Sequence, residues 1–173
     1  GLSKLSLNKQ ANQINRTINF NKSKKKEFII FNNSPDQKII LIKTKNYQTS
    51  TDNEKNGASF YNFVKSNLLT NFTFFETNIH ETQTKNKSFI DEFFHGMQLK
   101  SYEFNKYKSK KEMTDMNIDV AFNKKIPIKI KNNRFNSLLE GTNFTKDLVS
   151  EPGNILHPDE YAKRILKLKK IGL

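Results

Sequence analysis

Short apolar runs alternate along this chain with stretches in which apolar residues recur at helical spacing. The runs are rich in Ile and Phe and end in polar residues, a pattern typical of strands. The predicted strands are residues 27–31, 38–43, 72–75, 118–122 and 126–130. The predicted helices are residues 58–69, 88–102 and 133–149, and a further one that begins at Pro158. Because strands mixed with helices of this length pack as a central sheet covered by helices, we predict an α/β fold.

Polar segments connect these predicted elements. Residues 32–36 contain Asn, Ser and Pro between two apolar runs, which predicts a strand–turn–strand unit. Residues 44–57 are polar without periodicity and are predicted to be a loop, as is the charged segment 106–117. Pro127 lacks an amide N–H and predicts an edge position for the last strand. The segment before Glu27 has no apolar core and is not a secretory signal, although acid-poor, Ser-rich segments also occur in transit peptides.

The composition limits the kinds of protein this chain can be. Fifteen Phe supply enough apolar area for a core, although hydrophobic residues make up only 35% of the chain. Cysteine is absent, which excludes a disulfide framework and a thiolate metal site and fits a reducing, cytoplasmic setting. No run of about 18 apolar residues is present, so we expect no membrane partner.

The net charge of +13 suggests a nucleic-acid partner. Of the 30 basic residues only three are Arg, and the chain also contains 23 Asn. Lys, Asn, Ile and Phe have AT-rich codons, so an AT-rich genome would produce this bias without selection for binding. Arg, the preferred residue for bidentate recognition of phosphates and bases, is scarce. We therefore expect only weak, nonspecific attraction to polyanions.

The three histidines, His80, His95 and His157, have no other His or Cys at metal-ligand spacing. His95 follows Asp91 by four residues on a predicted helix, so the two can pair on one face. We interpret this pair as solvent-exposed rather than as an acid–base couple, because no third group orients it. His157 precedes a predicted helix and is expected to flank or cap its start.

The remaining polar residues form no recognisable catalytic motif. Asp91–Glu92 and Asp159–Glu160 are sequence neighbours that point to different parts of a helix surface, so we interpret them as exposed N-terminal charges. Glu151 follows a predicted helix without an acidic neighbour. The six glycines are scattered, which excludes a phosphate-binding loop. The required Gly-x-Ser-x-Gly motif is absent around Ser59, Ser66 and Ser150.

One segment, SYEFNKYKSKK at residues 101–111, interleaves aromatic and basic residues. Such a segment can stack on bases and hold a single strand of nucleic acid. The interpretation we favour is that Tyr102, Phe104 and Tyr107 pack on the domain while the lysines stay in water. No catalytic, metal-binding or substrate-binding residue is assigned in this chain.

The most specific motif lies in KDLVSEPGNILHPDEYAKR, residues 146–164. It resembles the junction between the two domains of the leucyl aminopeptidase (cytosol aminopeptidase) family of metallopeptidases. There a basic–acidic–Leu helix end is followed by Asn or Ser, Pro, a small residue, Asn, an apolar pair and a second Pro. The matching residues are Lys146, Asp147, Leu148, Ser150, Pro152, Gly153, Asn154, Ile155, Leu156 and Pro158, with Tyr161 and Ala162 after them. Residues 96–111 and 135–148 are similar to the family more weakly, and Phe144-Thr145 departs from it.

The resemblance implies a division of the chain into three parts. Residues 1–132 would form an N-terminal α/β domain of macro-domain-like shape, with a mixed central sheet flanked by helices. Residues 133–150 would form a linker helix. Residues 151–173 would start a truncated C-terminal peptidase domain. Within that frame, Pro152 and Asn154 are expected to build the turn between domains.

The resemblance also implies an activity that this chain does not carry by itself. Members release N-terminal amino acids from peptides with two divalent metal ions, Mn or Zn, held by the C-terminal domain. They assemble as hexamers, and some bind DNA. The family's Asn-Thr-Asp-x-Glu-Gly metal motif is missing here, so we expect this chain to bind no metal and to be inactive. A basic nucleic-acid-binding module is the alternative, and a free-standing macro-like ligand-binding domain is disfavoured by the lack of a Gly-rich loop.

Overall fold

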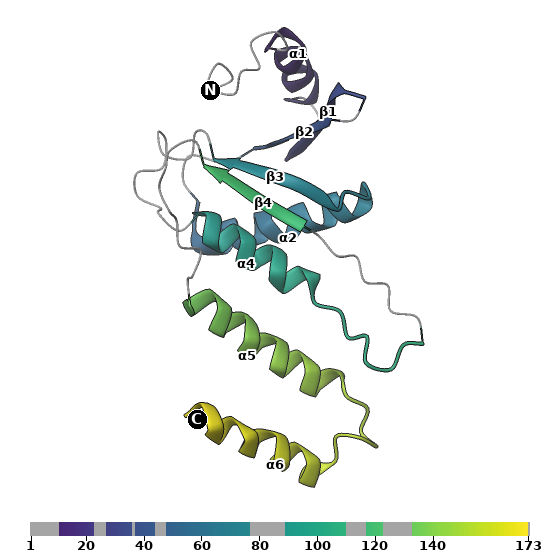
Figure 1. The fold of residues 1–173 in the computed structure, drawn as a ribbon, viewed down its shortest axis with the longest axis vertical. Coiled ribbons are helices and arrows are strands. Elements are labelled where there is room, and N and C mark those ends of the chain that lie inside the picture. The colour runs from purple at the N-terminus through teal and green to yellow at the C-terminus, as the bar shows by residue number, and fades with distance from the viewer. Residues whose placement is uncertain are drawn as a thin grey trace.

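The computed structural model describes residues 11–22, 27–35, 37–43, 48–76, 89–109, 117–122 and 133–172. These residues form an elongated stack of elements, with the N-terminal helix at one end and the C-terminal helix at the other (Figure 1). In chain order the elements are α1 (Ala11–Lys22), β1 (Phe28–Ser34), β2 (Gln37–Ile42), α2 (Ser50–Ser66), β3 (Asn71–Glu76), α4 (Phe89–Ser101), β4 (Asn117–Phe122), α5 (Asn133–Ser150), α6 (Pro158–Leu166) and the 3-10 helix η3 (Lys167–Ile171).

The described strands form one antiparallel pair and one parallel pair. β1 and β2 form an antiparallel hairpin in which Phe28 lies opposite Ile42, as the strand–turn–strand signal predicts. β3 and β4 are parallel, with Phe72 opposite Ile118. Parallel neighbours need a crossover connection, and α4 lies in the connection between these two strands. The α/β prediction is confirmed; the predicted strand at residues 126–130 lies outside the described residues.

Helices α2 and α4 build the core with the strands. Phe60 and Val64 on α2 and Phe93 on α4 are almost fully buried, and the Phe60 and Phe93 rings lie 5.5 Å apart. Phe28 of β1 and Phe72 of β3 contact the Phe60 ring at 5.5 and 5.6 Å. Burial of these large rings is the main source of apolar stabilisation in this part of the chain.

The two helices approach so closely that their crossing requires glycine. A Cβ atom added to Gly57 would lie 1.9 Å from the carbonyl oxygen of Phe93. A Cβ atom added to Gly96 would lie 2.0 Å from the carbonyl oxygen of Glu54. Because both obstacles are backbone atoms, neither can move aside without separating the helices.

The prediction of a loop at residues 44–57 is wrong from Ser50 onwards, because α2 begins there. A capping box starts the helix: Asp52 N–H donates to the Thr49 hydroxyl at 3.2 Å, and Thr49 N–H donates to the Asp52 carboxylate at 3.1 Å. The first turns of α2 are polar, so their hydrophobic pattern does not reveal the helix. Asn53 nevertheless is fully buried, because α4 covers it.

The N-terminal helix α1 was not predicted, since its sequence is polar and Asn-rich. It is held to β1, and its Ile14 is completely buried. At the other end of the chain, the prediction of a helix over residues 133–149 is confirmed within one residue by α5. Pro158 is the first residue of α6, as predicted. Figure 1 shows α5 between α4 and α6.

Candidate functional site

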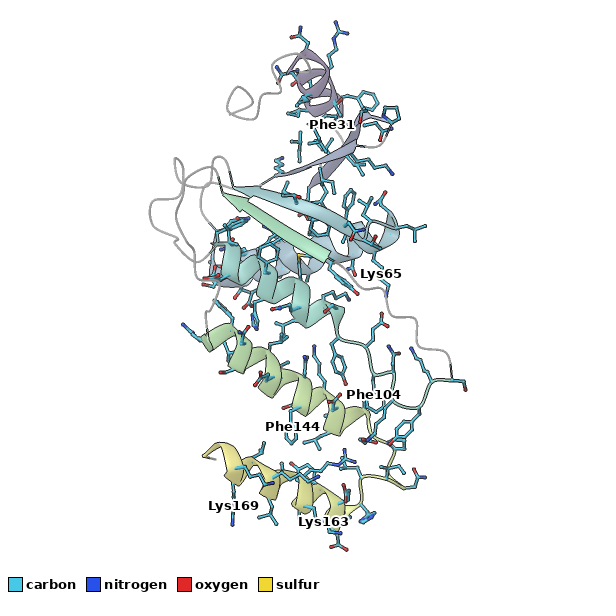
Figure 2. The ribbon with its side chains drawn as sticks, viewed as in Figure 1. Phe31, Lys65, Phe104, Phe144, Lys163 and Lys169 are labelled. Carbon is cyan, nitrogen blue, oxygen red and sulfur yellow. The ribbon has the colours of Figure 1, made fainter. Side chains whose placement is uncertain are left out.

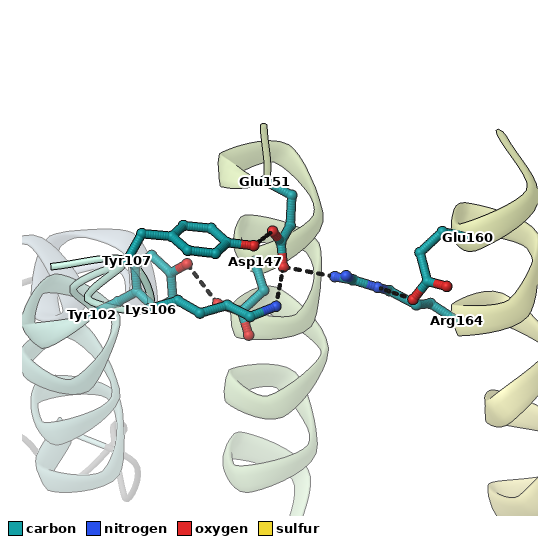
Figure 3. A network of polar contacts seen from close by, with 7 residues as sticks. All are labelled: Tyr102, Lys106, Tyr107, Asp147, Glu151, Glu160 and Arg164. Carbon is teal, nitrogen blue, oxygen red and sulfur yellow. Dashed lines mark hydrogen bonds and ion pairs between the residues drawn. The ribbon is translucent and has the colours of Figure 1, made fainter. Parts of the chain in front are cut away.

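The most connected polar residue of the described chain is Glu151, directly after α5. Its side chain is 1% exposed, and it accepts hydrogen bonds from three donors (Figure 3). The Lys106 ammonium and the Tyr107 hydroxyl donate from the segment after α4. Arg164 donates from α6 through Nη1, at 2.9 Å from Glu151 Oε1. One carboxylate therefore joins three separate parts of the chain.

These donors stabilise the ionised form of Glu151. The hydrogen bond from Lys106 is the largest cause, followed by that from Tyr107, and together with Arg164 they lower the pKa of Glu151 to about 2. The same contact with Glu151 raises the pKa of Lys106 and of Tyr107. Arg164 also donates through Nε to Glu160 at 3.1 Å, one turn earlier on α6.

A second set of contacts ties the segment after α4 to α5. The Tyr102 hydroxyl donates to the Asp147 carboxylate at 2.7 Å, and burial, followed by this bond, raises the pKa of Tyr102. The Lys146 ammonium donates to the carbonyl of Leu99 at 2.8 Å and lies 5.0 Å from the Tyr102 ring centroid. The Phe104 and Tyr107 rings are 5.8 Å apart.

These contacts bear on the aromatic and basic segment 101–111. Tyr102 and Phe104 are half-buried, as the packing interpretation predicts. Tyr107 is 51% exposed, so the interpretation is wrong for this ring, although its hydroxyl donates to Glu151. Lys106 remains 51% exposed, as predicted, and its ammonium also forms an ion pair with Glu151. Lys110 and Lys111 lie outside the described residues. Of the three aromatic rings that a single-stranded nucleic acid would stack on, those of Tyr102 and Phe104 are thus partly covered within the chain.

A different polar cluster lies where the first turns of α2 and α4 meet. The Glu92 carboxylate accepts hydrogen bonds from the Ser50 hydroxyl at 2.7 Å and from the Asn53 amide at 2.6 Å. Glu92 is only 5% exposed, so the expectation of an exposed N-terminal charge is wrong for this residue. Its position between two helices, which the sequence pattern does not report, accounts for the burial.

His95 is also placed differently from the prediction. It is buried, its Nδ1 lies 2.9 Å from Glu54 Oε1, and its ring centroid lies 4.9 Å from that of Phe135. The expected solvent-exposed pair with Asp91 is therefore wrong, because α2 supplies the carboxylate instead. The His95 Nε2 and the Asn53 Oδ1 are buried and have no hydrogen-bond partner within the described ranges.

The remaining candidate residues that the structure describes lie at the start of a helix or form a local hydrogen bond. His157 stands at the N-cap of α6, but its side chain makes no capping bond. Asp159 and Glu160 lie in the first turn of α6 as predicted. The Ser66 hydroxyl donates to the carbonyl of Asn62 at 2.7 Å. His80 lies outside the described residues.

These residues do not fit the two-metal centre that the family resemblance implies. The described ranges contain no group of three or more His, Asp or Glu side chains able to hold a metal ion. The most buried carboxylate at the junction, that of Glu151, is already neutralised by two cations, which oppose a divalent ion beside it. Glu151 was missed as a central residue because its partners Lys106 and Tyr107 are 45 and 44 positions away.

Comparisons with known proteins identify relatives of this chain. No model of a protein family matches it. A probable cytosol aminopeptidase of Rhodopseudomonas palustris (strain BisA53) is 35% identical over 82 residues, which cover 45% of this chain and 16% of that protein. One of Phytoplasma australiense is 33% identical over 96 residues, which cover 54% of this chain and 19% of that protein. Over about half of its length, the chain is similar in sequence to cytosol aminopeptidases.

The fold agrees with these sequence matches. A variant of tomato leucine aminopeptidase superposes with a TM-score of 0.69 at 19% identity, over 91% of this chain and 32% of that one. The α/β class that the hydrophobic pattern predicts is thereby confirmed. This chain spans less than a fifth of the length of the curated relatives named above. Within the described residues, no helix is both long and apolar enough to cross a membrane.

Proposed function

We propose that this chain is the N-terminal portion of a leucyl-type aminopeptidase that releases N-terminal amino acids from peptides in the cytoplasm. The observation that carries the proposal is the combination of matches to cytosol aminopeptidases with a fold like that of leucine aminopeptidase. The small share of each relative that the chain spans supports placing the chemistry in the remaining part of the enzyme.

We further propose that the domains divide at residues 1–132, 133–150 and 151–173. The continuous helix α5 supports the assignment of residues 133–150 as the linker. Helix α6 buries none of its residues and leaves Tyr161, Ile165 and Leu166 exposed. An apolar helix face left open in this way is what we expect of the first helix of a further domain.

The two divalent metal ions, Mn or Zn, belong in this proposal to the part of the enzyme outside this chain. The basis of that assignment is the family resemblance, since the Asn-Thr-Asp-x-Glu-Gly metal motif does not occur in this sequence. The proposed whole enzyme acts on peptides and assembles as a homo-hexamer. In it, this chain supplies the folded N-terminal domain and contacts between domains.

An activity assay tests the assignment of chemistry. The 173-residue chain and the full product of its gene are each assayed on leucine anilide with added Mn²⁺ or Zn²⁺. We expect turnover by the full product and none by this chain, because the metal-binding motifs are missing from it. Turnover by the 173-residue chain would refute the proposed division of labour, and an inactive full product would contradict the enzyme assignment.

Cysteine labelling tests the proposed domain boundary, because the natural chain has no cysteine. Ile165→Cys should react rapidly with a maleimide in the 173-residue chain, where Ile165 is 38% exposed. In the full gene product the same cysteine should be protected, since a further domain would cover it. Lys169→Cys is the control, because Lys169 is a polar, exposed residue on η3. Equal labelling of Ile165→Cys in both proteins would remove this support for the boundary.

A further inference from the structure

Helix α6 is docked with little help from hydrophobic burial. None of its residues is buried, and Tyr161, Ile165 and Leu166 expose much of their side chains. Apart from the following turn η3, no described element packs its backbone extensively on α6. A helix of nine residues is also marginal in water without tertiary contacts. Polar contacts must therefore contribute strongly to its placement.

The polar contact that joins α6 to the rest of the described chain is the bond from Arg164 to Glu151. Glu151 is shielded from water, and Arg164 exposes only 18% of its side chain. Lys106 and Tyr107 hold the same carboxylate from the opposite side (Figure 3). An ion pair shielded in this way is sensitive to the loss of one partner, because the remaining charge stays poorly solvated.

The connection between α5 and α6 is suited to act as a hinge. It is a short turn in which the amides of Ile155 and Leu156 both donate to the carbonyl of Pro152 at 2.9 Å. Pro152 and Pro158 bracket this turn, and its residues from Pro152 to Ile155 are exposed. Figure 2 shows α6 joined to α5 through this turn, with Lys163 of α6 and Lys169 of η3 on the side away from α5.

We propose that Glu151 is a latch: its contact with Arg164 holds α6 against the rest of the chain, and breaking that contact releases α6 as one unit while the α2–α4 core stays folded. This inference goes beyond the proposed peptidase role and does not rest on it. In a longer protein the latch would set how the segment after residue 150 is oriented relative to α5.

Hydrogen exchange of the 173-residue chain at neutral pH, followed by mass spectrometry, tests the latch. Glu151→Gln should speed exchange in peptides from residues 158–171 at least about tenfold, because the released helix melts locally. Exchange in α2 and α4 should not change. Glu160→Gln is the matched control, since it removes another carboxylate partner of Arg164 that lies within α6. This control should stay within about twofold of the natural chain.

Two further variants keep the test decisive if Glu151→Gln folds poorly. Arg164→Gln breaks the latch from the other side and should give the same fast exchange in α6. Tyr107→Phe removes one of three donors to Glu151 and should give a smaller increase. The proposal is overturned if α6 exchanges equally in Glu151→Gln and Glu160→Gln. It is also overturned if α2 and α4 lose protection together with α6 in both latch variants.

Discussion

Among the residues that the structure describes, two carboxylates, those of Glu92 and Glu151, are largely removed from water, and their partners differ. Neutral groups, the Ser50 hydroxyl and the Asn53 amide, satisfy Glu92. Two cations and a phenol satisfy Glu151. Because the donors to Glu151 are mostly charged, its bonds are of the stronger, charge-assisted kind and its ionisation is strongly favoured.

Acid should weaken the Glu151 contacts only at unusually low pH. The pKa of Glu151 is about 2 in the folded chain, below its ordinary value of 4.5. A depressed pKa means that the stabilisation is fully present above about pH 4.5 and is lost as pH falls towards about 2. An NMR titration of the carboxyl carbon should therefore give a midpoint near 2.

A substitution checks the cause of this shift. Lys106→Met should raise the midpoint, because the hydrogen bond from Lys106 is the largest single cause. A midpoint near 4.5 in the natural chain would contradict the hydrogen bonding of Glu151 described above, because burial alone raises the pKa of a carboxyl group.

Glu92→Gln should destabilise the fold by about 1–3 kcal/mol. The amide group of Gln would set a donor against the Ser50 hydroxyl or the Asn53 amide, both of which now donate to Glu92. Urea unfolding followed by circular dichroism measures the change in the free energy of unfolding. Glu140→Gln on α5 is the control, since Glu140 is exposed; its effect should stay within about 0.5 kcal/mol. Equal effects of the two substitutions would show that the α2–α4 cluster contributes nothing specific.

At the scale of elements, the crossing of α2 and α4 depends on two glycines. Gly57 and Gly96 let each helix approach the backbone of the other. Glycine lowers the intrinsic helix propensity, yet both positions lie inside helices. The close packing that they permit must outweigh that cost, which makes the crossing sensitive to the smallest added side chain.

Gly57→Ala and Gly96→Ala should each destabilise the chain by about 1–3 kcal/mol or more, because the added methyl meets backbone atoms. Gly141→Ala on α5 is the matched control: it meets nothing within 4 Å, so it should stabilise the chain by about 0.5–1 kcal/mol. Thermal and urea unfolding of the three variants give the comparison. A neutral or stabilising effect at Gly57 and Gly96 would mean that the helices lie further apart than described.

At the scale of the whole molecule, the charge of +13 should produce attraction to polyanions without sequence preference. Fluorescence anisotropy with two DNA duplexes of unrelated sequence tests this. We expect equal affinities at low salt and a large loss of binding by about 0.2 M salt, because counterion release drives such contacts. Retained binding to one duplex at that salt concentration would instead favour the nucleic-acid-binding alternative.

Much of the element order could be predicted because periodicity is a local property of the sequence. The apolar runs correctly indicated β1 to β4, and the stripes indicated α4, α5 and α6 close to their observed bounds. Helix α1 and the first turns of α2 could not be found in this way, since their residues are mostly polar. The Thr49 and Asp52 capping box was a local signal that could have located the start of α2.

The sequence by itself determined the α/β class and, through the motif at residues 146–164, the resemblance to leucyl aminopeptidases. The tertiary structure alone decided which polar residues are buried and with whom they pair: Glu92 with Asn53, His95 with Glu54, and Glu151 with Lys106, Tyr107 and Arg164. The physical reason is separation along the chain. Hydrophobic periodicity reports which side of one element faces the core, whereas these pairs join residues up to 45 positions apart and exist only once the helices are packed together.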